Sequence, residues 1–355
     1  MYVHVIGLII TILLAQNVVV HTKKADGTQM LMMKKSFFLL STIPFTLISG
    51  LRYFVGTDWK MYRNVFLQIK KGRQFSSLYF EKGYLALNKL VGFFSGNYVV
   101  FFTVIAFLIT AFWFVAIYYF SDNPTMSIIL WVLTQFYFFS FNGIRQALAI
   151  SLFYFGLVYL HKKNYVAYIV VMIIAISMHR SAIVMAPVML MANLRMRMSR
   201  YVEVLVAACI LGRFSVQIVN SYSFFEKYRM YLNIKNDFSV SDFVVVFVAW
   251  LFAISIKKYA SYNNNEKFNM FYNILFLALV FCILTAFVPY VYRFLLYFKY
   301  VTILLIPEIC KEYRYNKTSI TVKVTMYAVY LIQIFYYAFV MHYNEYTHYA
   351  WVIGK

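Results

Sequence analysis

The chain contains few charged residues. Only 13% of its 355 residues are Asp, Glu, Lys or Arg, whereas 63% are apolar. Apolar runs recur from residue 2 to residue 341 without a long polar region between them, and these runs are too many to be hidden in one water-soluble core. A soluble globular protein is therefore excluded, and we expect a polytopic membrane protein of the all-α class.

Cysteine and the common catalytic motifs are scarce as well. Cys209, Cys282 and Cys310 form no CxxC pair and lie in or beside apolar runs, so the sequence indicates neither a disulfide framework nor a zinc site. It contains no HExxH, DxD, Walker loop, GxGxxG or GxSxG pattern. The usual signatures of metalloenzymes, ATP-driven pumps and serine hydrolases are thus missing, and we expect no metal and no cofactor.

Acidic residues are rarer than basic ones. The chain has 12 Asp and Glu against 33 Lys and Arg, which gives a net charge of +21. The basic residues lie in short groups between apolar runs, as membrane topology signals do, so we do not expect nucleic-acid binding. By the positive-inside rule these groups mark the cytoplasmic side, and both termini then lie outside. The groups are KK at 23–24, KK at 34–35, HKKN at 161–164, RMRMSR at 195–200, KK at 257–258 and KEYRYNK at 311–317.

We expect about twelve transmembrane helices, with about 20 residues per crossing as the guide. The first run lacks a basic segment before it and is typical of a retained span rather than a cleaved signal. Two pairs of runs, around NGIRQ at 142–146 and HRS at 179–181, have short arms, and a single helix through 165–194 is the alternative for the second pair. The expected spans are 2–20, 36–51, 98–120, 125–141, 145–160, 164–178, 181–194, 201–219, 239–256, 269–288, 290–307 and 319–341.

These spans form a single transmembrane domain, residues 1–355. Only a long loop at 52–97 and a shorter one at 220–238 could fold outside the bilayer. Both loops are extracytoplasmic under this threading, because the basic groups occupy the other side.

Basic residues also occur at outer helix tips, where the positive-inside rule should have removed them. An arginine near hydrocarbon is costly unless it meets an anion or a water-filled cavity, although any one of them could instead snorkel to the lipid headgroups. Guanidinium groups donate hydrogen bonds in a rigid fork that suits phosphate oxygens. Taken together, the basic residues at these tips indicate an anionic ligand at the outer leaflet. They are Arg52, Arg145, His179, Arg180 and Arg293.

Three residues on the outer side could act as a base that activates a hydroxyl, namely His179, Asp58 and Glu81. His179 stands first, because a neutral imidazole is available at physiological pH. Asp58 has several cations close in sequence that lower its basicity, and it could instead pair with one of them. Deeper in the spans, Arg213 and Lys299 could extend the anion site, line an inner cavity or pair with a carboxylate.

Four segments taken in order resemble the EpsG-like branch of Wzy-type polysaccharide polymerases, and the resemblance spans roughly residues 36–300. They are RYFVGTDWKMY (52–62), FEKGY (80–84), NGIRQALA (142–149) and MHRSA (178–182), with VPYVYRF (288–294) following them. Tyr62, Arg63 and Gln146, which lie in or beside these segments, are further candidate substrate-binding residues.

The resemblance implies a fold similar to the C-type glycosyltransferases. It also implies metal-independent transfer of a growing glycan from an undecaprenyl diphosphate carrier to a hydroxyl of a lipid-linked repeat unit. The reaction would take place at the extracytoplasmic face of the bacterial inner membrane, where the arginines at the helix tips would hold the diphosphate. A chain-length regulator and a flippase are candidate partners.

Two other functions stay open on the sequence. An O-antigen ligase also uses a polyprenyl diphosphate donor and differs in its acceptor. A lipid-linked oligosaccharide flippase would also be multispan and basic, but its charges should line a cavity that faces both sides. The gathering of basic residues at the outer tips favours an enzyme that works on that face.

Overall fold

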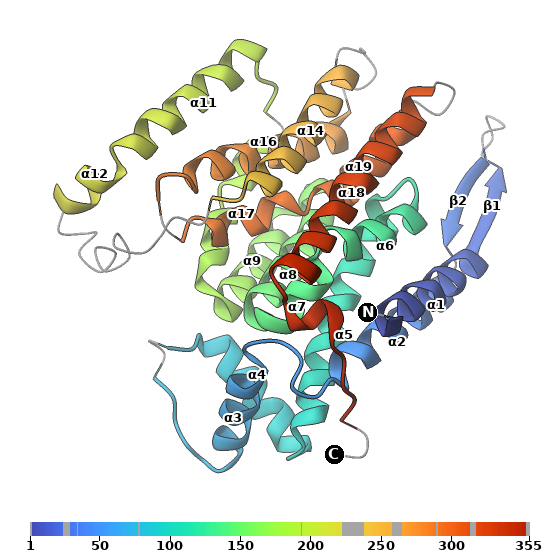
Figure 1. The fold of residues 1–355 in the computed structure, drawn as a ribbon, viewed down its shortest axis with the longest axis vertical. Coiled ribbons are helices and arrows are strands. Elements are labelled where there is room, and N and C mark those ends of the chain that lie inside the picture. The colour runs from blue at the N-terminus through green and yellow to red at the C-terminus, as the bar shows by residue number, and fades with distance from the viewer. Residues whose placement is uncertain are drawn as a thin grey trace. The chain divides into compact units, whose positions relative to one another are not determined.

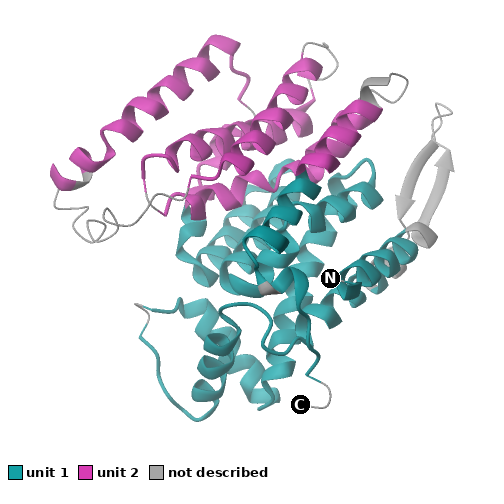
Figure 2. Cartoon of the chain, viewed as in Figure 1, with its two compact units in different colours: residues 1–183, 330–355 teal, residues 184–329 magenta. Residues whose placement is uncertain are grey.

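The computed structural model describes a helical protein (Figure 1). The chain forms two compact units, Met1–Ile183 with Tyr330–Lys355 (unit 1) and Val184–Val329 (unit 2), and each is described by itself (Figure 2). The residues that the structure describes are 2–23, 29–33, 35–76, 79–192, 194–221, 238–257, 265–288, 290–312 and 317–352.

Unit 1 begins with a helix, a short antiparallel hairpin and a second helix. The hairpin, with Val19 opposite Met33, was not expected; its first strand is rich in β-branched residues, which favour extended backbone. The elements are α1 (Tyr2–Val18), β1 (Val19–Lys23), β2 (Gln29–Met33), α2 (Lys35–Gly50), α3 (Trp59–Lys70), α4 (Lys82–Phe94), α5 (Tyr98–Phe120), α6 (Pro124–Leu133), α7 (Phe136–Asn142), α8 (Ile144–His161), α9 (Tyr165–Met178) and, near the C-terminus, α20 (Asn344–Thr347).

Unit 2 is also built of helices. The 3-10 helix η1 (Arg180–Met185) leads into it from unit 1, and α19 (Lys317–Phe335) with the π-helix η3 (Tyr336–Val340) leads back. Its other elements are α10 (Val188–Met191), α11 (Met198–Arg213), α12 (Ser215–Ser221), α14 (Val240–Lys257), α16 (Glu266–Leu284), α17 (Tyr292–Lys299) and α18 (Thr302–Glu312).

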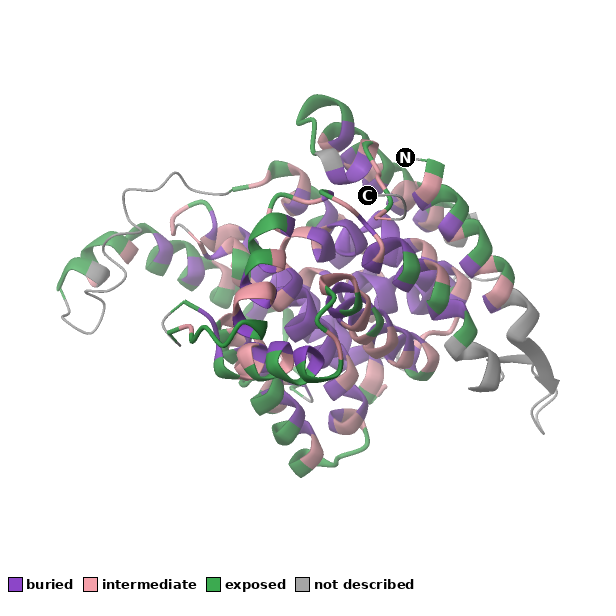
Figure 3. Cartoon of the chain, turned by 90° about the horizontal axis from the view of Figure 1, so that it is seen from below, coloured by how far each residue is buried: buried purple, intermediate pink, exposed green. Residues whose placement is uncertain are grey.

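The core of unit 1 is arranged around α5, which packs against both α2 and α8, while α8 packs against α9. Aromatic side chains fill these contacts: Trp113 of α5 stacks on Tyr154 of α8 with ring centroids 4.1 Å apart. Buried residues lie on the inner helix faces and exposed ones on the outer faces (Figure 3). Several exposed side chains are large and apolar, such as Val166, Val170 and Ile173 on α9, as expected for a helix that contacts lipid.

Part of the expected set of spans is present as long apolar helices. Within its described residues, five helices are long and apolar enough to cross a membrane, or six if the bent pair α6 and α7 is one span. The expected helices at 98–120 and 145–160 are confirmed as α5 and α8. The five are Tyr98–Phe120, Ile144–His161, Val240–Lys257, Glu266–Leu284 and Ile320–Val340.

Backbone breaks explain why several expected spans are shorter or divided. The run 125–141 bends by 47° between α6 and α7, where Gln135 adopts a left-handed conformation with φ of 69°. A single helix through 165–194 is excluded, because α9 ends at Met178 and His179 is extended. The run 181–194 forms only η1 and the short helix α10, which begins after Pro187.

Of the two expected extracytoplasmic loops, the long one lies almost entirely within the described residues. The long loop 52–97 contains α3 and α4, two helices that the sequence did not specify in detail. The shorter loop at 220–238 lies largely outside the described residues, which stop at 221 and resume at 238.

Candidate active site

The segment between α2 and α5 forms two amphipathic helices that cover part of unit 1. The buried residues of α3, Trp59, Tyr62, Val65, Phe66 and Ile69, follow the three- and four-residue spacing of one helix face. This face packs against α4 and α5, and α4 also packs against α9. The packing brings residues of the long loop to the start of α8 and the end of α9.

An ion pair joins the loop to α8. Nη1 of Arg145 lies 2.5 Å from Oε2 of Glu81, and the two side chains are 18% and 10% exposed. The same Nη1 donates to the carbonyl of Tyr79 at 3.4 Å. The guanidinium group also lies over the rings of Phe80 and Tyr84, at 4.9 and 5.6 Å from their centroids. Arg145 is therefore held in a fixed orientation on the first turn of α8.

The second oxygen of Glu81 reaches the break after α9. Oε1 accepts a hydrogen bond from the backbone N–H of Arg180 at 3.2 Å. This approach requires Gly83, because a Cβ atom there would clash with the side chain of Ser177 and lie 2.7 Å from its carbonyl oxygen. One carboxylate thus connects the start of α8 to the end of α9. Both of its oxygens already accept hydrogen bonds, which lowers the basicity of the carboxylate. Glu81 therefore fits the role of holding Arg145 and the backbone of Arg180 better than the role of a base.

Tyr62 and Arg63 extend this cluster along α3. Tyr62 is 3% exposed and lies beside Arg145. Burial raises the pKa of its hydroxyl, so the hydroxyl stays protonated at neutral pH. The guanidinium group of Arg63 lies 4.8 Å from the ring centroid of Tyr98. The Nε atoms of Arg63 and Arg145 are buried and have no hydrogen-bond partner among the described residues.

The contacts of His179 favour one tautomer. Its Nδ1 accepts the backbone N–H of Ser181 at 3.3 Å and lies 2.9 Å from the Ser181 hydroxyl. A backbone N–H can only donate, so Nδ1 is the unprotonated nitrogen and the neutral ring carries its proton on Nε2. This geometry makes His179 a hydrogen-bond donor at Nε2. It argues against its place as the first candidate base.

The side chain of Arg52 is buried and bound to the backbone around it. Its side chain is 2% exposed, and it donates to the carbonyl oxygens of Val55 and Phe141, each at 3.2 Å, and to that of Ser49. Burial lowers its pKa to about 10, so it keeps its charge at neutral pH. Main-chain carbonyls thus use donors on all three nitrogens of Arg52, and a role in holding a diphosphate stays a prediction.

The remaining candidates of unit 1 lie around the cluster. Asp58 precedes α3, is partly exposed and does not cap this helix with its side chain. Gln146 follows Arg145 on α8 and is 5% exposed. The side chain of Arg180 is exposed at the start of η1.

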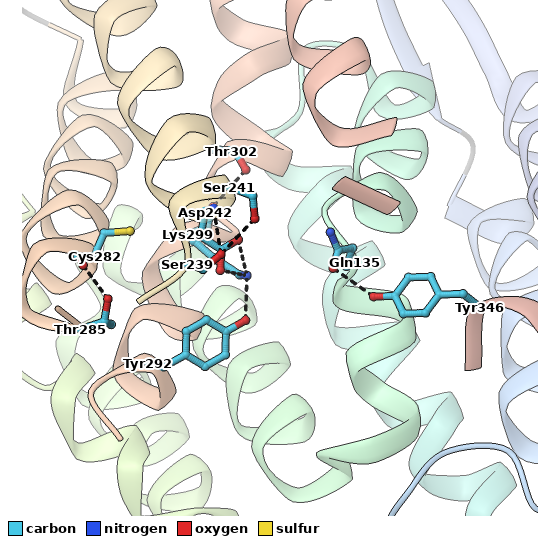
Figure 4. A network of polar contacts seen from close by, with 10 residues as sticks. All are labelled: Gln135, Ser239, Ser241, Asp242, Cys282, Thr285, Tyr292, Lys299, Thr302 and Tyr346. Carbon is cyan, nitrogen blue, oxygen red and sulfur yellow. Dashed lines mark hydrogen bonds and ion pairs between the residues drawn. The ribbon is translucent and has the colours of Figure 1, made fainter. Parts of the chain in front are cut away.

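Three candidates lie in unit 2. Arg213 ends α11 and Arg293 lies in α17, and both are exposed. Nζ of Lys299 lies 3.1 Å from both carboxylate oxygens of Asp242 and 3.4 Å from the hydroxyl of Tyr292 (Figure 4). Of the roles that the sequence left open for Lys299, the structure thus selects the ion pair.

One buried carboxylate in unit 1 was not among the sequence candidates. Glu345, in α20, is 5% exposed and accepts a hydrogen bond from Nδ2 of Asn142 at 2.5 Å. Nearby, the Tyr346 hydroxyl donates to Oε1 of Gln135 at 3.0 Å (Figure 4). The chain has only 12 acidic residues. Their scarcity is the sequence signal that could have pointed to Glu345, because an acidic residue beside apolar runs needs a polar partner.

A model of the EpsG family matches residues 35–351, a range that contains every candidate residue named above. No curated protein and no solved structure matched the chain. In the part of the chain that the structure describes, no three His, Cys, Asp or Glu side chains are grouped so as to hold a metal ion.

Proposed function

Since this chain belongs to the EpsG family of Wzy-type polymerase-like membrane proteins, we propose that it polymerises a polysaccharide. It transfers a growing glycan from an undecaprenyl diphosphate carrier to a hydroxyl of a lipid-linked repeat unit. The acceptor oxygen forms a bond to the anomeric carbon while the bond from that carbon to the diphosphate breaks. The hydroxyl proton leaves to a base or to water, and the diphosphate leaves as an anion.

The observation that carries this proposal is the cluster of Arg145, Glu81 and Tyr62, with Arg63 and Arg180 beside it. The leaving diphosphate gains negative charge in the transition state, and preorganised cations stabilise this charge. The guanidinium group of Arg145, whose side chain is 18% exposed, supplies such a cation. Because arginines can carry this role, the reaction is proposed to need no metal.

The roles of the acid and base candidates follow from their contacts. Glu81 holds Arg145 and the backbone of Arg180. His179 donates from Nε2 to a phosphate or sugar oxygen. Asp58, partly exposed at the start of α3, becomes the first candidate to accept or orient the acceptor hydroxyl.

Location and partners are further parts of the proposal. The basic groups between the apolar runs support a cytoplasmic side opposite the α3–α4 segment, so the cluster faces the extracytoplasmic side of the inner membrane. The glycan substrates are amphiphiles whose polyprenyl chains lie in the bilayer. A flippase that delivers repeat units and a chain-length regulator are the proposed partners.

Deletion of the gene followed by sizing of the cell's glycans tests the function. A polymerase defect leaves single repeat units on the final acceptor and no long chains. Long chains that stay on the polyprenyl carrier would instead show a ligase, and repeat units trapped on the cytoplasmic face would show a flippase. Either of these two results would overturn the proposal, and reintroduction of the wild-type gene must restore the original pattern.

A further inference from the structure

The C-terminal segment of the chain is anchored beside the proposed active site. After η3, its backbone runs along residues 51–53: the N–H of Tyr53 donates to the carbonyl of Ala350 at 2.8 Å, and that of Val352 to the carbonyl of Leu51 at 2.9 Å. All of these residues belong to unit 1. The segment therefore lies against the start of the long loop that carries the cluster.

Glu345 is the charged residue that this segment buries. Its Oε1 accepts the hydrogen bond from Nδ2 of Asn142, while Oδ1 of Asn142 accepts the backbone N–H of Thr57 at 2.6 Å and lies 3.2 Å from the Thr57 hydroxyl. The N–H of Thr57 can only donate, so this contact fixes which end of the amide is oxygen. Glu345, Asn142 and Thr57 thus form one directed chain of hydrogen bonds.

Two members of this chain, Thr57 and Asn142, adjoin the cluster in sequence. Thr57 directly precedes Asp58 and the first turn of α3, which carries Tyr62. Asn142 is the last residue of α7 and lies three positions before Arg145. Gly56 permits the contact, because it has a φ of +97° and a Cβ atom there would lie 2.7 Å from the carbonyl oxygen of Phe141.

Burying Glu345 carries an energetic cost. Burial raises the pKa of its carboxyl, while hydrogen bonds from its own backbone and from Asn142 act in the opposite direction. Replacing a buried polar group and its partner by apolar residues often costs little stability, so a buried carboxyl suggests a functional reason for its presence. The contact with Asn142 offers one, because a charge-assisted hydrogen bond holds a flexible amide in one orientation.

We propose that Glu345 is a positioning residue for the transfer reaction. Through Asn142 it holds the start of α3, with Asp58 and Tyr62, in register with Arg145 at the start of α8. The inference rests on the proposed function, because it assigns Glu345 to the same site. It implies that the C-terminal segment, far from the motifs in sequence, is part of the active-site structure.

The test uses purified, full-length protein with lipid-linked repeat units and compares Glu345→Ala with Glu345→Gln. Glu345→Ala should lower kcat about 10- to 100-fold, the effect of losing one hydrogen bond to a charged group, with little change in KM because the diphosphate ligands remain. Glu345→Gln should lose much less, because its amide oxygen can still accept from Asn142 although without the carboxylate charge. Wild-type kcat in Glu345→Ala, or equal losses in both variants, would overturn the inference.

A reciprocal pair keeps the test decisive if Glu345→Ala fails to fold. Asn142→Asp keeps the acceptor for Thr57 but places two carboxylates in contact, so kcat should fall; Asn142→Asp combined with Glu345→Gln should recover it. Absence of recovery in the double variant would contradict the inference. Arg145→Lys in the same assay distinguishes failure of this inference from failure of the proposed function. If Arg145→Lys keeps the wild-type rate, the proposed active site is wrong. If Arg145→Lys is slow, that site is supported and only the role of Glu345 is in question.

Discussion

Replacement of Arg145 by lysine probes the proposed diphosphate site most sharply. The guanidinium group uses Nη1 for Glu81 and for the carbonyl of Tyr79, and its Nε is buried without a partner. A lysine has one ammonium group, which can keep the ion pair with Glu81. It cannot at the same time present a second, fixed edge to a phosphate. The variant should therefore keep the folded cluster and lose a contact that matters in the transition state.

The magnitude follows from the loss of one preorganised, charge-assisted contact to the leaving diphosphate. Such a loss costs about 2–4 kcal/mol, or about 30- to 1,000-fold in rate. The assay is transfer by purified protein, with single-turnover rates measured at saturating donor. Membrane yield and the elution profile in detergent show whether the variant folds.

The matched control is Arg73→Lys. Arg73 lies between α3 and α4, is exposed, and donates to Gln68 at 3.2 Å without contacting the cluster residues. It should transfer at the wild-type rate. Equal rates for Arg145→Lys and Arg73→Lys would refute the reasoning, because Arg145 would then serve only the ion pair with Glu81.

Three further predictions concern packing, topology and unit 2. Gly83→Ala should separate α4 from α9 and slow transfer. Gly92→Ala on the same helix is the control: the nearest atom to its new Cβ lies 3.8 Å away, so it should be neutral or slightly stabilising. Equal transfer rates in the two variants would contradict the role of the close contact between Gly83 and Ser177. A cysteine at Ser76 should react with an impermeant thiol reagent in intact cells after the native cysteines are removed, and protection would reverse the proposed orientation. Lys299→Met should lower the free energy of unfolding by about 3–5 kcal/mol, because it leaves the buried carboxylate of Asp242 unpaired. Adding Asp242→Asn should recover most of this loss in a thermal unfolding assay. No recovery in the double variant would contradict the ion pair.

The sequence predicts much of the unit 1 cluster. Arg145 and Arg180 were singled out as basic residues at helix tips, and Glu81 as a candidate base in the long loop. The structure brings Glu81 into contact with both. This worked because polar residues at the ends of apolar runs are few and costly, so their positions are informative. The helix breaks at 143 and 179 were also visible, since a glycine and a polar triplet interrupt the runs there.

The individual roles could not be read from the sequence. In sequence, Arg52 lies at the end of an apolar run like the other arginines. In the structure it donates to the carbonyl oxygen of Phe141, which is distant in sequence. The tautomer of His179 depends on the backbone N–H of Ser181, and hydropathy has no information on such a contact. Glu345 escaped notice because its partner Asn142 lies in another segment of the chain.

Several expected spans are shorter or divided for a related reason. Apolar runs of about 15 residues were each counted as a crossing, whereas the run 181–194 divides at Pro187 and forms only short helices. Hydropathy measures the length of a run but not the backbone breaks within it.

The central claim is tested most directly by the product that the purified protein makes from defined lipid-linked repeat units. Wild-type protein in proteoliposomes should convert undecaprenyl diphosphate-linked repeats into a ladder of longer lipid-linked glycans and release undecaprenyl diphosphate, one molecule for each bond formed. Arg145→Lys should give the same ladder far more slowly. Release of the glycan to a different acceptor without lengthening, or no glycan transfer by folded wild-type protein, would contradict the account.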